Sequence, residues 1–88
     1  MTTPTLTFKA LADPTRRQML DRLRQGDLNA GALAEGLPMT KASVSHHLAL
    51  LKQAGLIRVR RQGQHLVYTL DATVFQEALQ WMMAFLKD

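Results

Sequence analysis

The feature that most constrains the fold is one amphipathic helix followed by two short β-like runs. The helix is predicted over residues 40–54, with Thr40 as its N-cap and Gly55 directly after its end. On a helical wheel, His47 and Ala54 border a narrow apolar arc made of Val44, Leu48 and Leu51. The opposite side carries only polar and small residues: Lys41, Ala42, Ser45, His46, Ala49, Lys52 and Gln53. One face of this helix is therefore expected to pack on a core while the other faces outward.

Two runs with the pattern of strands follow this helix. Residues 56–60 and 65–70 alternate β-branched or aromatic residues with polar ones, and Gly63 between them can supply the positive φ of a hairpin turn. We expect the tip of the hairpin to present the side chains Arg60, Arg61, Gln62 and Gln64. A helix followed by a basic hairpin predicts a winged helix-turn-helix, a mainly α fold with about five helices and a small two-stranded β-hairpin as the wing.

Three shorter helices are predicted earlier in the chain. The first covers residues 6–11 and ends ahead of an Asp-Pro pair, since the residue before a proline avoids the helical region. Asp13 is the expected N-cap of the second helix, which runs to Gly26, and Asn29 is the expected N-cap of the third. The third helix and the one over 40–54 are the two members of a helix-turn-helix, and the second member of such a pair enters the DNA major groove.

The charges along the chain are strongly segregated. The net charge is +4, from 11 basic and 7 acidic side chains, yet residues 36–70 contain no Asp or Glu. The same stretch holds Lys41, Lys52, Arg58, Arg60, Arg61 and the three histidines His46, His47 and His65. This distribution predicts a surface that binds a polyanion, with the predicted helix near base edges and the hairpin near phosphates. Arg16, in the second helix, fits a local structural role better than a phosphate contact.

The last helix is predicted after Asp71 as its N-cap, and it is unusually apolar. Its apolar residues, from Val74 to Leu86, cover an arc of roughly 200°, about twice the width that one core requires. We assign the surplus to a homodimer interface formed by the terminal helices of a single domain over residues 1–88, because so short a chain buries little surface alone. The alternative is that the first helix covers this surface within one chain.

Two segments of the chain carry a specific combination of residues. One is Asp-Pro-Thr-Arg at 13–16, and the other has Val-Ser-His-His-Leu at 44–48 followed by Ala-Gly-Leu at 54–56. Found together in this order, they resemble the ArsR/SmtB family of bacterial winged-helix repressors, and the resemblance extends from Phe8 to about Leu86. It implies a homodimer on a palindromic double-stranded DNA operator. The DNA contacts that it implies are Thr40, Lys41, Ala42, Ser45 and His46 and the wing from Arg60 to Gln64.

The chain departs from many members of that family in its potential metal ligands. It has no Cys, and the last helix has no His, so regulation through those ligand types is not supported and neither metal nor cofactor is expected. The resemblance is therefore to the subset of autorepressors that lack such ligands. His46 and His47 point about 100° apart on one helix and do not readily chelate one ion together. We expect His46 to face DNA, His47 to border the core and His65 to lie near the wing.

Two classes of function remain open from the sequence. The first is a sequence-specific DNA-binding transcriptional regulator, a homodimeric repressor with the helix at 40–54 in the major groove and the wing at 58–66 against the backbone or minor groove. The second is a protein-interaction module that uses the apolar last helix without binding DNA. No enzyme is expected, because the sequence shows no phosphate-binding glycine loop, carboxylate pair or cysteine nucleophile. The absence of a signal peptide or membrane-spanning pattern predicts a cytoplasmic bacterial protein, associated with the nucleoid when bound to DNA.

Overall fold

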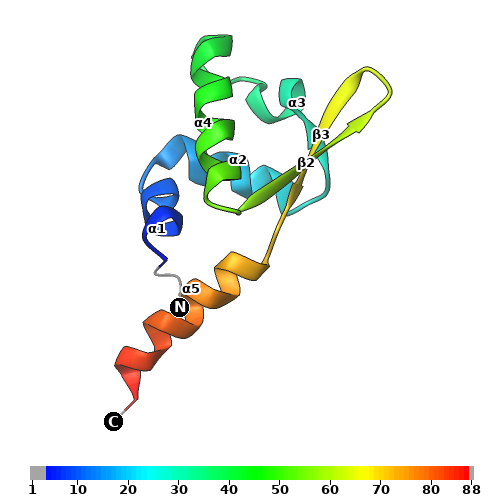
Figure 1. Cartoon of the computed structure of the whole chain (residues 1–88). Helices are drawn as coiled ribbons and strands as arrows, with labels where there is room; N and C mark the ends of the chain where they lie inside the picture. The colour runs from blue at the N-terminus through cyan, green and yellow to red at the C-terminus, as the bar shows by residue number, and fades with distance from the viewer. Residues whose placement is uncertain (1–3, 88) are drawn as a thin grey trace.

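The computed structural model describes residues 4–87 and has the architecture predicted from the sequence. Its elements are α1 (Thr5–Leu11), α2 (Pro14–Leu23), β1 (Leu28–Asn29), α3 (Ala30–Ala34), α4 (Lys41–Gln53), β2 (Ile57–Gln62), β3 (His65–Leu70), α5 (Thr73–Met83) and a 3₁₀ helix η1 (Ala84–Leu86). The β2–β3 hairpin projects to one side of α2, α3 and α4, and α5 extends away from them at the opposite end (Figure 1). Within the described range, none of the helices is both long and apolar enough to cross a membrane.

Three helices begin at the residues that the sequence predicts as caps. The side chains of Asp13, Asn29 and Thr40 each accept a hydrogen bond from the backbone N–H three residues later, at 3.0, 2.8 and 3.1 Å. Each bond satisfies one of the N–H groups that a helix leaves free in its first turn. The starts of α2, α3 and α4 are therefore fixed by local chemistry.

The sheet differs from the prediction in two respects. The β2–β3 ladder runs from Ile57 opposite Leu70 to Gln62 opposite His65, so β2 is longer than expected and only Gly63–Gln64 form the loop. Gly63 has φ +63° and Gln64 keeps a negative φ, the combination of a type II′ turn. In addition, β1 pairs antiparallel with β3 and gives the strand order β1-β3-β2. A strand of two residues has no detectable alternation, which is why the sequence did not reveal it.

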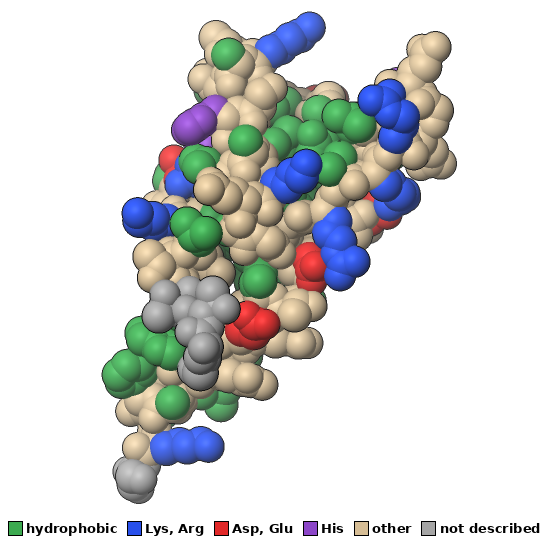
Figure 2. Space-filling view, in the orientation of Figure 1, with side chains coloured by type: hydrophobic (Ala, Val, Ile, Leu, Met, Phe, Trp, Pro, Cys, Tyr) green, Lys and Arg blue, Asp and Glu red, His purple; other side chains and the backbone are tan. Residues whose placement is uncertain are grey.

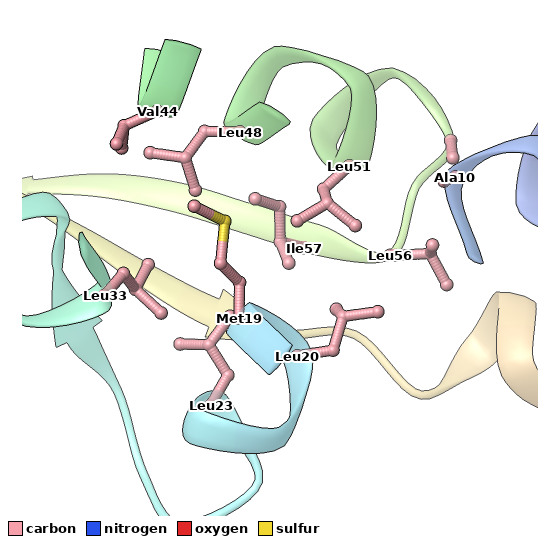
Figure 3. Packing of buried hydrophobic residues seen from close by; sticks show 11 residues of the cluster. Ala10, Met19, Leu20, Leu23, Leu33, Val44, Leu48, Leu51, Leu56 and Ile57 are labelled. Atoms are coloured by element: carbon pink, nitrogen blue, oxygen red, sulfur yellow. The ribbon is translucent and has the colours of Figure 1, made fainter. Parts of the chain in front are cut away.

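The core lies between α2, α4 and the sheet. The apolar arc of α4 is buried, and Leu51 at its centre has no exposed surface. Figure 3 shows Met19 of α2 in the middle of the cluster, with its side chain directed toward Leu48 and Ile57. Met19 is also fully buried. The core face predicted for the helix over residues 40–54 is confirmed. Its burial fixes how α4 is rotated about its own axis.

Three arginines of α2 bind main-chain carbonyl groups at the ends of neighbouring helices. The bonds run from Arg16 Nε to Ala10 O (2.8 Å), Arg16 Nη2 to Lys9 O (3.0 Å), Arg17 Nη1 to Leu11 O (2.7 Å), and Arg22 Nη1 to Leu33 O (2.8 Å) and Ala32 O (3.3 Å). The last carbonyls of a helix lack intrahelical partners and carry its negative dipole end, so a guanidinium group stabilises them. The structural role predicted for Arg16 is confirmed.

Asp71 joins β2 to the start of α5, although not as the N-cap that the sequence predicts. The N-cap is Ala72, and Asp71 accepts from the Thr73 N–H (2.9 Å) from one position further out. Its other oxygen accepts from Arg58 Nε at 2.7 Å. The Thr73 backbone N–H and then Arg58 lower the pKa of Asp71 to about 2, since both stabilise the carboxylate.

We expect Leu51→Ala to lower the free energy of unfolding by about 2–5 kcal/mol, because it removes a completely buried side chain and leaves a cavity. Lys52→Ala, at the neighbouring exposed position of the same helix, is the control and changes it by less than about 0.5 kcal/mol. Urea denaturation followed by circular dichroism measures both. Equal effects of the two substitutions would contradict the described packing of α4.

Asp71→Asn should lower the melting temperature at pH 7, because the amide no longer binds Arg58 as a charged partner. The carboxylate stabilises the fold fully above its unfolded pKa of about 4, and this stabilisation is lost as the pH falls toward about 2. The difference in melting temperature between the wild type and Asp71→Asn is therefore expected to shrink between pH 5 and pH 2. Asp21→Asn, which removes an exposed i,i+3 ion pair with Arg24, serves as the control and changes little at any pH.

Candidate nucleic-acid interface

The outward face of α4 is open to solvent from its first residue. Burial of the apolar arc leaves Lys41, Ala42, Ser45 and His46 exposed on the other side. The Thr40 hydroxyl is occupied locally, since it caps α4 and lies 3.2 Å from the Ser43 hydroxyl. The helix-turn-helix formed by α3 and α4 thus presents a short row of small and polar side chains at the N-terminal end of its second helix.

The wing carries a second group of exposed polar side chains. Arg61 and Gln62 lie near the end of β2, and Gln64 lies in the loop; all three are exposed. In the part of the chain that the structure describes, no acidic group lies within ion-pair distance of Arg61 or Lys41. These two cations are therefore available to an external anion.

Arg60 does not project from the tip of the hairpin, contrary to the sequence-based expectation. It lies within β2 opposite Val67, and its Nη1 donates to Asp27 Oδ2 at 2.8 Å and to the Thr69 hydroxyl at 3.0 Å. The bond from Arg60 lowers the pKa of Asp27, because it favours the carboxylate. Asp27 directly precedes β1, so its position beside β2 follows from the strand that the sequence did not reveal.

Residues 36–70 contain no acidic side chain, but acidic side chains from other parts of the chain lie beside them. Arg58 is paired with Asp71 and Arg60 with Asp27, two carboxylates that lie outside residues 36–70. Figure 2 shows Lys and Arg side chains over the far end of α4 and on the hairpin, and red carboxylates beside some of the blue side chains lower on the hairpin. The basic surface is therefore narrower than the sequence indicated and consists of Lys41 and Lys52 on α4 and Arg61 on the wing.

The three histidines lie where the sequence placed them. His46 is exposed on the outward face of α4, and His65 is exposed at the start of β3 beside the wing. The His47 side chain is only 15% exposed and borders the core. The rings of His46 and His47 are 6.1 Å apart and tilted by 54°. Among residues 4–87, no group of three or more His, Cys, Asp or Glu side chains is arranged to hold a metal ion.

A broad apolar surface remains on the terminal helices. Phe8 of α1 packs against Trp81 with ring centroids 5.6 Å apart, and Trp81 meets Phe85 at 4.9 Å. This contact covers only part of the surface, because the large apolar residues still exposed there are Leu6, Leu79, Trp81, Met82, Met83, Phe85 and Leu86. Phe85 and Leu86 keep 72% and 81% of their surface exposed. Coverage by α1 within one chain therefore does not account for the apolar excess.

Comparison with known proteins identifies a family. A family described as "Helix-turn-helix domain" matches residues 11–60. The transcriptional repressor SdpR of Bacillus subtilis is 49% identical over 79 residues, which are 90% of this chain and 88% of SdpR. Two further transcriptional regulators are longer, and the chain covers 65% and 64% of their lengths.

Solved structures agree with this assignment. The crystal structure of the ArsR family transcriptional regulator RHA00566 has a TM-score of 0.86 and 32% identity, over 91% of this chain and 88% of that one. The homodimeric winged helix-turn-helix DNA-binding domain of Mb0332 from Mycobacterium bovis has a TM-score of 0.74 and 34% identity, over 91% and 76%. The resemblance seen in the sequence is confirmed: the chain belongs to the ArsR/SmtB family of winged helix-turn-helix transcriptional regulators.

Proposed function

We propose that this chain is a sequence-specific double-stranded DNA-binding transcriptional regulator that acts as a homodimeric repressor. The observation that carries the proposal is the exposed polar face of α4, whose rotation is fixed by its buried arc. It is accompanied by an exposed wing arginine, Arg61, that forms no ion pair among the described residues. The similarity to a repressor over nearly its whole length supports the repressing role. Since that relative is bacterial, we place the protein in the bacterial cytoplasm, at the nucleoid when it is bound to DNA.

The first turns of α4 supply the base contacts in this proposal. Lys41 can donate to the guanine acceptors of the major groove, and Ser45 can exchange hydrogen bonds with several base edges. Ala42 lets the helix backbone approach closely and offers a methyl group to thymine. His46 and Thr40 flank this row and complete the reading surface. A helix of 13 residues is about 20 Å long, so its N-terminal half can enter the groove while its C-terminal half packs on the domain.

The wing supplies the backbone contacts. Arg61, Gln62 and Gln64 are exposed beside the loop, where they can bind phosphates or enter the minor groove. Arg60 is a secondary contact, because reaching a phosphate requires it to leave Asp27. We therefore assign the larger electrostatic contribution of the wing to Arg61.

The exposed apolar surface of α5, η1 and α1 fits a second copy of the chain. Trp, Phe and Met are favoured at subunit interfaces, and the neighbouring structure of Mb0332 is described as homodimeric. A two-fold axis through these helices would place two α4 helices in successive major grooves, about 34 Å apart, on a palindromic operator. An interaction module without DNA binding is not favoured, because it leaves the polar face of α4 and Arg61 without a role.

Fluorescence anisotropy with the DNA upstream of the protein's own gene tests the proposal. We expect tighter binding to this DNA than to a random duplex, and a loss of affinity as salt rises, because bound Lys and Arg release counterions from phosphates. Equal affinity for both duplexes, or affinity that does not change with salt, would refute DNA regulation by this chain.

Lys41→Ala and Ser45→Ala are expected to relax the sequence preference, each costing about 1–3 kcal/mol of discrimination at the bases that it contacts. Arg61→Ala should weaken all duplexes similarly and reduce the salt slope by about 1. Lys87→Ala, at the far end of the chain beyond η1, is the control for a lost positive charge and should retain both preference and slope. The same anisotropy titrations distinguish these outcomes.

Phe85→Glu should raise the dissociation constant of the homodimer by more than about tenfold, because it would bury a carboxylate in an apolar contact. Gln76→Glu adds the same charge at an exposed position near the start of α5 and serves as the control. Sedimentation velocity over a range of concentrations measures both. A monomeric wild type, or a dimer unchanged by Phe85→Glu, would rule out this interface.

A further inference from the structure

One polar contact connects α4 to the N-terminal end of α2. His47 of α4 places its Nδ1 atom 3.2 Å from Arg16 Nη1 and 3.9 Å from Asp13 Oδ2. This hydrogen bond joins a side chain of α4 directly to a side chain of α2. His46, its neighbour in the chain, lies on the DNA-facing side. The contact thus connects the reading surface to the N-terminal end of α2.

The chemistry of Arg16 determines the protonation state that this contact requires. A guanidinium group only donates hydrogen bonds, so His47 Nδ1 must accept and the ring must be neutral with its proton on Nε2. A protonated imidazole carries hydrogen on both nitrogens and would direct a like charge at Arg16. The Asp13 carboxylate, on the same side of the ring, is the acceptor that it would then turn to.

Neither partner on α2 is free to follow the ring. Arg16 is held by the carbonyls of Lys9 and Ala10, and Asp13 is held as the N-cap of α2 by the Arg16 N–H at 3.0 Å. Shortening 3.9 Å to the roughly 2.8 Å of a charged hydrogen bond must therefore come from the α4 side of the contact, through rotation of the His47 side chain, displacement of α4, or both. A displacement of α4 on this scale would change where its first turn meets a base edge.

We propose that His47 is a positioning residue for DNA reading. In its neutral form, the imidazole binds Arg16 and holds α4 at the angle at which it reads DNA. When the imidazole is protonated, it leaves Arg16 for Asp13, and the preference of the protein for its operator over other DNA falls. This inference rests on the proposed function of α4. It gives the regulator a response to acidification that needs no bound effector.

The charged groups around His47 fit this exchange. Asp13 and Arg16 face it from α2, and the ring of His46 lies on α4 with its centroid 6.1 Å away. Lys9 of α1 contributes its carbonyl through Arg16, while its own side chain is exposed. The Arg16 backbone N–H, above all, lowers the pKa of Asp13, so the acceptor remains a carboxylate over the pH range in which imidazoles titrate.

The first test concerns the histidine alone. A long-range proton–nitrogen NMR spectrum of the full chain at pH 7.5 should show His47 with hydrogen on Nε2 and an unprotonated Nδ1. Arg16→Met, which keeps a long apolar side chain but no donor, should raise the fraction of His47 with hydrogen on Nδ1, for which Asp13 is the nearby acceptor. A His47 protonated on Nδ1 at pH 7.5 would overturn the inference, and it would do so whether or not the protein binds DNA.

The second test measures operator preference, the ratio of the dissociation constants for a random duplex and for the upstream DNA, at pH 7.5 and pH 5.5. General gains in positive charge cancel in this ratio. We expect it to fall about fivefold in the wild type, the factor for one lost hydrogen bond. His47→Asn, whose side-chain oxygen takes the place of Nδ1 and can accept from Arg16 at both pH values, should hold the ratio within about twofold.

His65→Gln is the control, because it removes another imidazole near the wing and should keep the wild-type response. An equal fall in His47→Asn and wild type would overturn the proposal, because the pH response would then come from another group. A ratio of one at pH 7.5 would instead refute DNA reading itself and with it the positioning role, while the NMR spectrum still reports separately on the Arg16–His47 bond.

Discussion

The buried arc of α4 is the contact on which the rest of the structure depends. Val44, Leu48 and Leu51 belong to one buried cluster with Met19 of α2 and Ile57 of β2. Each large side chain buried there contributes about 1.5–3 kcal/mol. A rotation of α4 by half a turn would expose this arc and bury lysine and histidine in its place. The buried apolar arc of α4 thus determines which face of the helix meets solvent.

The basic residues divide into three groups with different tasks. Arg16, Arg17 and Arg22 bind main-chain carbonyls and hold α1 and α3 against α2. Arg58 and Arg60 are paired with aspartates at the base of the hairpin. Net charge alone therefore overstates the surface that can attract a polyanion. Lys41 at the start of α4, Lys52 near its end and Arg61 at the wing are exposed and form no ion pair among the described residues, so they remain for that role.

Most of the fold could be predicted from the sequence because it depends on interactions between residues that are close together in the chain. The caps of α2, α3 and α4, the buried arc and the glycine turn of the hairpin all depend on neighbours within one or two turns of chain. The pairing of Arg60 with Asp27 depends instead on a two-residue strand that brings distant segments together, and no local pattern encodes it. Likewise, Asp71 reaches the first turn of α5 from outside the cap position, since Ala72 takes the N-cap.

The candidate nucleic-acid interface also combines features that depend on nearby residues with features that depend on strand pairing. The outward face of α4 was predictable from helix periodicity, whereas the contribution of each wing residue required the register of β2 on β3. The central claim, that two copies of α4 read DNA together, is tested most directly by sequencing the duplexes that the protein selects from a random pool. We predict an enriched inverted repeat with half-site centres about 10 base pairs apart. Selection of no common sequence, or of a single half-site without a repeat, would contradict it.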